Sequence, residues 1–350
     1  DEVLLVLIDE LYKLKELQLI GDNKLNYLSL IPPFERLCCV EEKVLRDQAI
    51  NKFSNILNDI PYYIDNESIF NKHIYPLLDR LCHGEWHTSR IAGATLLATV
   101  FGTLIKYIKN ENNIDGKIEN KMDTDIDNEN KIIKEYTLYK EKLLNLLIII
   151  SKDSIPIVRR SAIITLGKMI NELTNKDEII SKYLPLFTKL AKDEQDNVRV
   201  FAVQTLLQFN NILTKQDIND HLIHYIRELC IDKAWRVRYI AADNFIKICN
   251  MLDRQFVNDS MLSYYIHLLD DDEPEVRAIA ITKIPQISKV IGIELSIQKL
   301  IPIIDTLVSD KNKYARASLA SIIIPFCHLL PINIVTEHIL KCILTILNDD

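Results

Sequence analysis

Apolar residues along this chain recur with the spacing of an amphipathic helix, in two stretches per repeat. The first stretch has apolar side chains at i, i+3, i+4 and i+7 over about three helical turns. Examples are residues 183–192, 222–229 and 300–308. A short polar segment follows, and then Val-Arg-x-x-small opens the second apolar stretch. The pattern therefore predicts a helix, a tight turn and a second helix in every repeat.

An Asp and an Arg six residues apart mark these turns at a fixed interval. The pairs are Asp153 and Arg159, Asp193 and Arg199, Asp232 and Arg238, Asp271 and Arg277, and Asp310 and Arg316. Successive aspartates lie 40, 39, 39 and 39 residues apart. A period of about 40 residues with two helices is typical of HEAT or armadillo repeats. The sequence thus predicts an all-α fold without a sheet, a HEAT-repeat α-solenoid whose antiparallel helix pairs form a right-handed superhelix.

We expect one HEAT-repeat array over residues 1–350, flanked by half repeats at 1–24 and 333–350. Full repeats are expected at 25–66, 67–109, 134–174, 175–214, 215–253, 254–291 and 292–332. Neither end resembles a capping repeat, so we interpret the chain as a fragment of a longer array.

The two earliest full repeats are more divergent, with Arg46 and Arg90 at the Arg position. The distance from Arg90 to Arg159 is 69 residues, which exceeds one period. The excess falls at 110–133, a polar, Asn-rich segment without aromatic residues. We expect it to be a disordered insertion that the fold does not need.

Two roles are open for the repeated Asp and Arg. In the first, the Asp caps the second helix, and the Arg pairs with an Asp of the adjacent repeat, so that charge-assisted bonds form a ladder. In the second, the arginines line a groove that binds anions or phosphopeptides. The residues assigned to the ladder are Asp153, Arg159, Arg199, Asp232, Arg238, Asp271, Arg277, Asp310 and Arg316.

Composition limits the function. A formal net charge of −7 argues against a nucleic-acid partner, which needs cations to displace phosphate counterions. We find no signal peptide, and no apolar run long enough to span a membrane, so no membrane partner is expected. Seven scattered cysteines indicate reduced core thiols in a protein of the cytoplasm or nucleus.

Candidate chemistry is sparse. Cys82, His83 and His87, or His221 with His224, could contribute to a metal site, but no second pair has metal-finger spacing. No nucleotide-binding or hydrolase motif is present, and seven glycines are few for phosphate-binding loops. We therefore expect no catalytic residue, no cofactor and no metal.

The only two tryptophans, Trp86 and Trp235, fall in turns. Other repeats carry turn residues there, namely Pro156, Asp196, Pro274 and Lys313. Two interpretations are open, because a large aromatic on a turn either anchors a partner or folds back over its own repeat.

The turns resemble, in order and spacing, those of the scaffold (A) subunit of protein phosphatase 2A. The matching stretches are 31–37, 40–47, 86–90, 157–160, 193–199, 232–239 and 275–278. That family has fifteen HEAT repeats, and this chain is similar to the second half of repeat two through the first half of repeat nine. The 110–133 insertion and Ala234, where the family has Ser, are departures. The insertion leaves open how partners bind near repeats four and five.

The resemblance implies a non-catalytic scaffold that presents intra-repeat turns to regulatory B-type subunits. It also implies that the catalytic subunit binds C-terminal repeats that this chain does not include. The implied partner-binding residues are Trp86, Pro156, Arg160, Asp193, Glu194, Asp196, Trp235 and Arg236. The alternatives are a nuclear-transport HEAT receptor or another protein-binding adaptor, and an enzyme with an attached HEAT domain.

Overall fold

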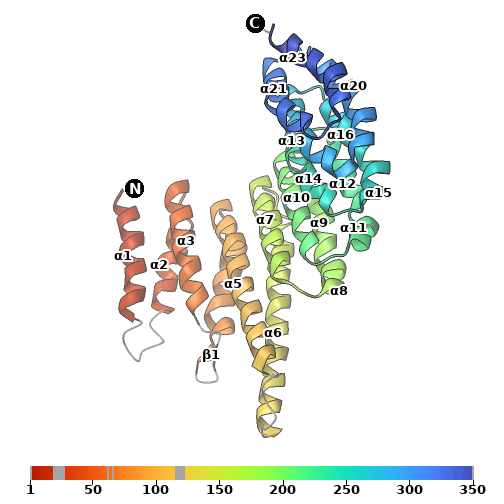
Figure 1. Ribbon diagram of the computed structural model, residues 1–350. Coiled ribbons are helices and arrows are strands. Elements are labelled where there is room, and N and C mark those ends of the chain that lie inside the picture. Colours follow the sequence, from red (N-terminus) through yellow and green to blue (C-terminus); the bar gives the residue numbers. More distant parts are fainter. Residues whose placement is uncertain (1, 19–27, 61–62, 65–66, 115–122, 349–350) are drawn as a thin grey trace. The chain divides into compact units, whose positions relative to one another are not determined.

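The computed structural model describes residues 2–18, 28–60, 63–64, 67–114 and 123–348 (Figure 1). The chain divides into two compact units, Asp1–Leu190 and Ala191–Asp350. Each unit is built from paired helices joined by short turns.

The first unit holds two layers of helices. One layer consists of α1 (Glu2–Gln18), α3 (Lys43–Asp59), α5 (His87–Ile114) and α7 (Pro156–Glu172), which pack on one another in chain order. The other consists of α2 (Ile31–Leu37), α4 (Tyr75–Cys82) and α6 (Asp123–Ile150). A π turn, η2 (Phe70–Ile74), precedes α4, and the unit ends with α8 (Lys176–Glu178), η4 (Ile179–Tyr183) and α9 (Leu184–Ala191).

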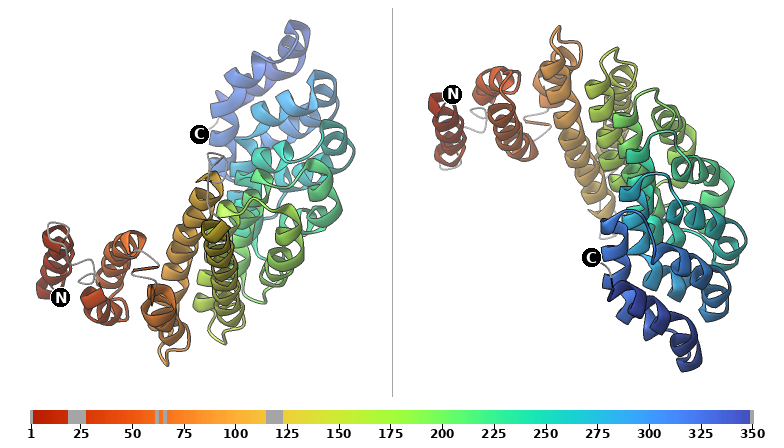
Figure 2. Two further views of the ribbon diagram at one scale, coloured as in Figure 1. Left: turned by 90° about the horizontal axis from the view of Figure 1, so that it is seen from below. Right: turned by 90° about the horizontal axis from the view of Figure 1, so that it is seen from above.

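The second unit repeats this arrangement (Figure 2). Its second helices are α10 (Asp196–Gln208) with the 3-10 turn η5 (Phe209–Asn211), α13 (Trp235–Asp243) with α14 (Phe245–Asn250), α17 (Pro274–Ile281) with α18 (Ile284–Ile291), and α21 (Lys313–Cys327). Its first helices are α11 (Lys215–His221) with α12 (Ile223–Cys230), α15 (Arg254–Phe256) with η6 (Val257–Met261) and α16 (Leu262–Leu269), α19 (Ile293–Leu295) with η7 (Ser296–Leu300) and α20 (Ile301–Leu307), and α22 (Ile332–Ile334) with η8 (Val335–Ile339) and α23 (Leu340–Ile346). The helices α10, α13, α17 and α21 pack side by side in chain order.

In six repeats, a small residue three positions after the repeat Arg is buried between helices. It is fully buried in five repeats, at Ala49, Ala162, Ala202, Ala241 and Ala280. In α5 the position is Gly93, where an added Cβ would lie 2.9 Å from the Sγ of Cys82 and 3.0 Å from its backbone nitrogen. Close helix approach is therefore the physical reason for the small side chain.

A π turn recurs inside the first helices. It starts at Phe70, Ile179, Val257, Ser296 and Val335, and the last three lie 39 residues apart. Pro76, Pro185 and Pro302 each stand at the second position after such a turn. Proline has no N–H to donate in an α-helical hydrogen bond. The wider π-helical turn can therefore precede it without the loss of such a bond. The turns at η6 and η8 have no such proline, so proline is not required for them.

The all-α prediction is confirmed with one small exception. Strands β1 (Tyr63–Ile64) and β2 (Glu67–Ser68) form an antiparallel pair between α3 and η2, so the expectation of no sheet is wrong at this hairpin. Tyr63 and Ile64 are aromatic and β-branched residues, which favour strands.

The expected insertion at 110–133 differs from the structure. Residues 110–114 continue α5 and residues 123–133 belong to α6, so the interpretation as a disordered loop is wrong for both. Extending a helix that packing already fixes adds one backbone hydrogen bond per residue, and this gain exceeds the modest penalty of the Asn and Asp residues in both extensions. Residues 115–122 lie outside the described part of the chain.

The expectation that no apolar run reaches membrane-spanning length is also wrong. Among the described residues, His87–Lys109 is long and apolar enough by composition, and 56% of its apolar window is buried. Its helix α5 packs against α3, α4, α6 and α7, so the apolar length serves the core of the first unit.

Candidate functional site

Buried ion pairs join neighbouring repeats at their turns. Arg238, one turn into α13, donates from Nε and Nη2 to Asp271 of the next repeat at 2.6 and 2.7 Å. Its Nη1 donates to the backbone carbonyl of Asp232 in its own turn at 2.7 Å. Each arginine of this kind therefore closes its own turn and reaches the next one.

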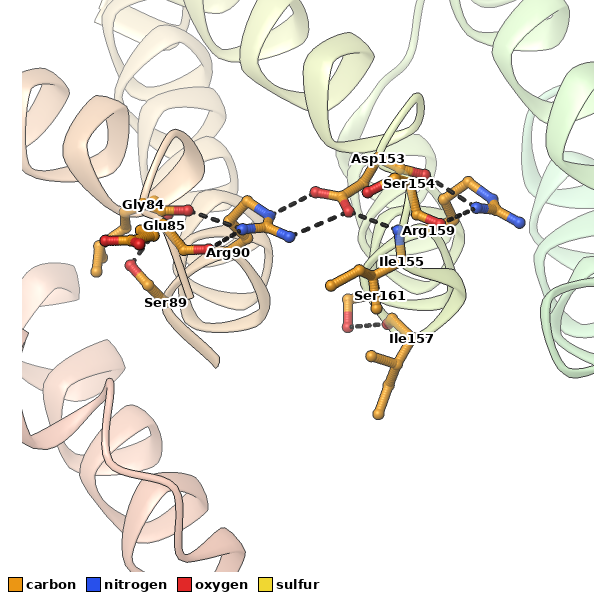
Figure 3. A network of polar contacts seen from close by, with 11 residues as sticks. Gly84, Glu85, Ser89, Arg90, Asp153, Ser154, Ile155, Ile157, Arg159 and Ser161 are labelled. Atoms are coloured by element: carbon orange, nitrogen blue, oxygen red, sulfur yellow. Dashed lines mark hydrogen bonds and ion pairs between the residues drawn. The ribbon is translucent and has the colours of Figure 1, made fainter. Parts of the chain in front are cut away.

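The same two-bond geometry recurs along the chain. The pairs, which we call the ladder, are Arg90 with Asp153, Arg199 with Asp232, Arg238 with Asp271, and Arg277 with Asp310. The prediction that the Arg pairs with an Asp of the adjacent repeat is confirmed for Arg199, Arg238 and Arg277. Figure 3 shows the first link, in which Arg90 reaches Asp153 at 2.5 and 3.2 Å. The ladder predicted from the sequence omits Arg90, although Arg90 stands at the repeat Arg position.

The aspartates brace the turns instead of capping the helices. Asp153 accepts a bond from the backbone N–H of Ile155 at 2.8 Å, and Asp232, Asp271 and Asp310 each accept from the residue two positions on. The N-cap residues Ile155, Ala234 and Glu273 follow and make no side-chain cap. The capping role expected for the aspartates is therefore wrong, because their oxygens are already used by the turn and by the arginine.

Electrostatics follow from this geometry. The hydrogen bond to Asp271 raises the pKa of the Arg238 guanidinium above its usual value. Burial alone would raise the pKa of Asp310, but the bonds from Arg277 and from the backbone of Asn312 outweigh burial and lower it. The four ladder arginines are committed to these aspartates and are not free to line an anion-binding groove.

The ladder is interrupted between α3 and α5. Arg46 donates to the carbonyls of Val40 and Glu41 at 2.9 and 2.8 Å, as the other arginines do in their own turns. The next repeat has Gly84 at the Asp position, and the Nε of Arg46 is buried without a hydrogen-bond partner among the described residues. A Cβ at Gly84 would lie 2.4 Å from the Oγ of Ser89, so this turn has no room for the missing Asp.

The turn residues predicted to bind a partner lie at the helix starts. In the first unit, Pro156 is the first residue of α7, and Arg160 is half-buried on the same helix. Trp86 precedes α5 and is 66% exposed. Trp86 is therefore one position earlier in its repeat than Trp235, which is the first residue of α13, so the two tryptophans are not equivalent.

In the second unit, the predicted residues lie on two consecutive turns. Asp193 and Glu194 precede α10, Asp196 begins α10, and Trp235 and Arg236 begin α13. Arg236 is exposed and lies 3.5 Å from Asp196, so the structure brings these two together. Its guanidinium also lies 5.3 Å from the centre of the Trp235 ring, a cation–π arrangement.

The structure bears out, in part, the interpretation that Trp235 folds back over its own repeat, and the anchor interpretation stays a prediction. The indole is half-buried and meets Tyr239 edge to face at 6.5 Å, so one edge packs on its own helix. The indole and the adjacent exposed Arg236 together form a charged and aromatic surface at the turn.

Residues weighed for metal binding do not converge. Within the described ranges, no group of three or more His, Cys, Asp and Glu side chains could hold a metal ion. Cys82 is buried, His83 pairs with Asp79, and His224 pairs with Glu228. The seven cysteines are free thiols, and five of them are buried.

These features define a HEAT-repeat solenoid that joins its repeats by ion pairs and exposes charged and aromatic side chains on its turns. Residues 254–332 match the family model described as PPP2R1A-like HEAT repeat. The chain is 28% identical over 215 residues to the probable serine/threonine-protein phosphatase PP2A regulatory subunit of Caenorhabditis elegans. It is 27% identical over 187 residues to the protein phosphatase 2A scaffold subunit of Dictyostelium discoideum. The resemblance drawn from the turns is confirmed.

The chain spans less than a third of the length of these relatives. The two alignments include 61% and 53% of this chain, but only 30% and 25% of the relatives. A solved structure of Kap95p with RanGDP superposes with a TM-score of 0.59 at 13% identity, covering 88% of this chain and 36% of that chain. At that identity the likeness establishes the solenoid fold alone.

Proposed function

We propose that this chain is part of a non-catalytic scaffold of a protein phosphatase 2A-type holoenzyme, and that its intra-repeat turns bind a regulatory B-type subunit. The observation that carries the proposal is the surface formed by Trp235, Arg236 and Asp196. Trp and Arg are the residue types most enriched at binding hot spots. The turns resemble those of the phosphatase scaffold, and the relatives are named as regulatory and scaffold subunits of a phosphatase.

The ladder supports this role by fixing the turns. Trp235 and Arg236 lie between Asp232 and Arg238, whose backbone and side-chain bonds hold the turn. A pre-ordered turn loses little conformational freedom on binding, so more of the contact energy remains as affinity. The catalytic subunit is expected on repeats beyond this chain, and the complex is expected in the cytoplasm or nucleus.

The test is a titration in which a purified B-type subunit is added to the chain and to its double variant Trp235→Ala, Arg236→Ala. We expect at least roughly tenfold weaker binding, equivalent to about 1.4 kcal/mol. The melting temperature should be nearly unchanged, because Arg236 is exposed and Trp235 only half-buried.

The chain offers a matched control at another turn. Lys313 lies 5.3 Å from the ring of the exposed Tyr314, which repeats the cation–aromatic arrangement at the start of α21. The double variant Lys313→Ala, Tyr314→Ala should bind the B-type subunit normally. Equal affinity of both double variants and the parent would refute the anchor. Tight binding of the isolated catalytic subunit to residues 1–350 would refute the assignment of partners to repeats.

A further inference from the structure

A hollow of about 310 Å³ lies on the second-helix layer of the second unit, across α13, α17 and α21. Its lining includes Tyr239, Pro274, Glu275, Ala278, Ile279 and Tyr314. We call this hollow the inner groove. It lies on helix faces and is separate from the Trp235–Arg236 surface, although Tyr239 contacts Trp235.

The inner groove is apolar with aromatic walls. Ala278 is a small residue on the middle helix, so the space above it stays open between the larger neighbours. Tyr314 is 67% exposed, although a tyrosine ring gains free energy when it is covered. The volume is near the lower end of the roughly 300–1,000 Å³ typical of ligand pockets. It suits a few side chains of an extended segment better than a folded domain.

Glu275 is the charged residue among those that line the inner groove, and it is unpaired among the described residues. Glu275 lines the groove, is exposed and has no ion-pair partner in the described part of the chain. Asp272 lies in the preceding turn, is also exposed, and makes no ion pair with any described residue. By contrast, Asp271 is neutralised by Arg238, and Asp243 pairs with Lys283 at 2.7 Å. Lys313, next to Tyr314, places a positive charge beside the Tyr314 side of the groove.

We propose that the inner groove binds an extended segment of a partner protein that carries apolar side chains next to Lys or Arg. Apolar groups would fill the space between Tyr239 and Tyr314, and the cations would meet Glu275 and Asp272. A second copy of this chain is a poor occupant, because its formal net charge of −7 would oppose Glu275 and Asp272. The inference goes beyond the proposed function, since it concerns another surface and another chemistry.

The test is a selection of random twelve-residue peptides displayed on phage against the whole chain. We expect enrichment of peptides that combine Lys or Arg with Leu, Phe, Trp or Pro. Synthetic copies of the enriched peptides are then titrated by fluorescence anisotropy. Glu275→Lys and Tyr314→Ala, both at exposed positions, should each weaken binding at least roughly fivefold, or about 1 kcal/mol.

Two controls separate this surface from others. Glu337→Lys makes the same charge change at an exposed position on η8 and should leave peptide affinity unchanged. Trp235→Ala, Arg236→Ala reports on regulatory-subunit binding, so the two proposals fail independently. Enrichment of acidic peptides, or peptides that bind the Glu275→Lys and Tyr314→Ala variants as well as the parent, would overturn the inference.

Discussion

Arg238 and Asp271 lie in different repeats, yet they share two hydrogen bonds of 2.6 and 2.7 Å, and Asp271 is only 3% exposed. Removing either partner leaves a buried charge without its counterion. The two residues therefore couple the stability of one repeat to that of the next.

We expect Arg238→Ala to lower the free energy of unfolding by about 1–3 kcal/mol, and Arg199→Ala to do the same, because a buried aspartate loses its partner. Chemical denaturation measures the change. Arg236→Ala, two residues from Arg238 but exposed, is the control and should stay within about 0.5 kcal/mol. Midpoints equal to the parent for both ladder variants would mean that the links add no stability.

Arg46→Ala should cost less than Arg199→Ala. Arg46 donates hydrogen bonds within its own turn but has no Asp partner among the described residues. Its removal therefore leaves no buried carboxylate there without a counterion. The comparison is a difference in denaturation midpoint between the two variants. An equal or greater loss for Arg46→Ala would show that the backbone bonds, and not the ion pair, carry the stabilisation.

Two glycines of α5 should respond to alanine in opposite directions. At Gly93 a Cβ would meet the backbone nitrogen of Cys82 at 3.0 Å, so overpacking of about 1–3 kcal/mol exceeds the gain of about 1 kcal/mol in helix propensity. At Gly102 the nearest atoms are 3.8 Å away, so the propensity gain should prevail. Melting temperature should therefore fall for Gly93→Ala and rise for Gly102→Ala. A rise for Gly93→Ala would show that α4 and α5 separate easily.

Alkaline pH should destabilise the fold before it affects the ladder. Burial raises the pKa of Cys230 and of Cys249 from 9.0 to about 12. Between pH 9 and 12 the unfolded chain releases these protons while the folded chain keeps them, so the free energy of unfolding falls as pH rises. Denaturation at several pH values measures the slope. Cys249→Ala should make the slope shallower, and an unchanged slope would exclude this thiol as a cause.

Much of the fold can be predicted from the sequence because each repeat carries the same short-range sequence features. The Asp-to-Arg spacing, the small buried residue after most of the repeat arginines and the apolar periodicity all predict pairs of helices, which the structure contains, although α5 and α6 extend into the expected 110–133 insertion. The link from Arg199 to Asp232 could be predicted as well, since the period itself places the two turns side by side.

Other features depend on side-chain packing that no spacing reveals. Gly84 breaks the ladder because Ser89 occupies the space of a side chain there. Spacing shows that Trp86 precedes its repeat Arg by one more residue than Trp235 does, but it does not reveal that Trp86 is 66% exposed or that Trp235 packs edge to face on Tyr239. The inner groove needs α13, α17 and α21 together, so Glu275 and Tyr314 carry no signal in isolation.

The interruption at Arg46 and Gly84 has a mechanical consequence. A stack of repeats under tension acts like springs in series, and the extension concentrates at the softest joint. The joint between α3 and α5 has no arginine–aspartate clamp among its described residues, whereas the joint from Arg90 to Asp153 has one. A pulling force along the first unit should open the unclamped joint first, while the clamped repeats that follow stay rigid.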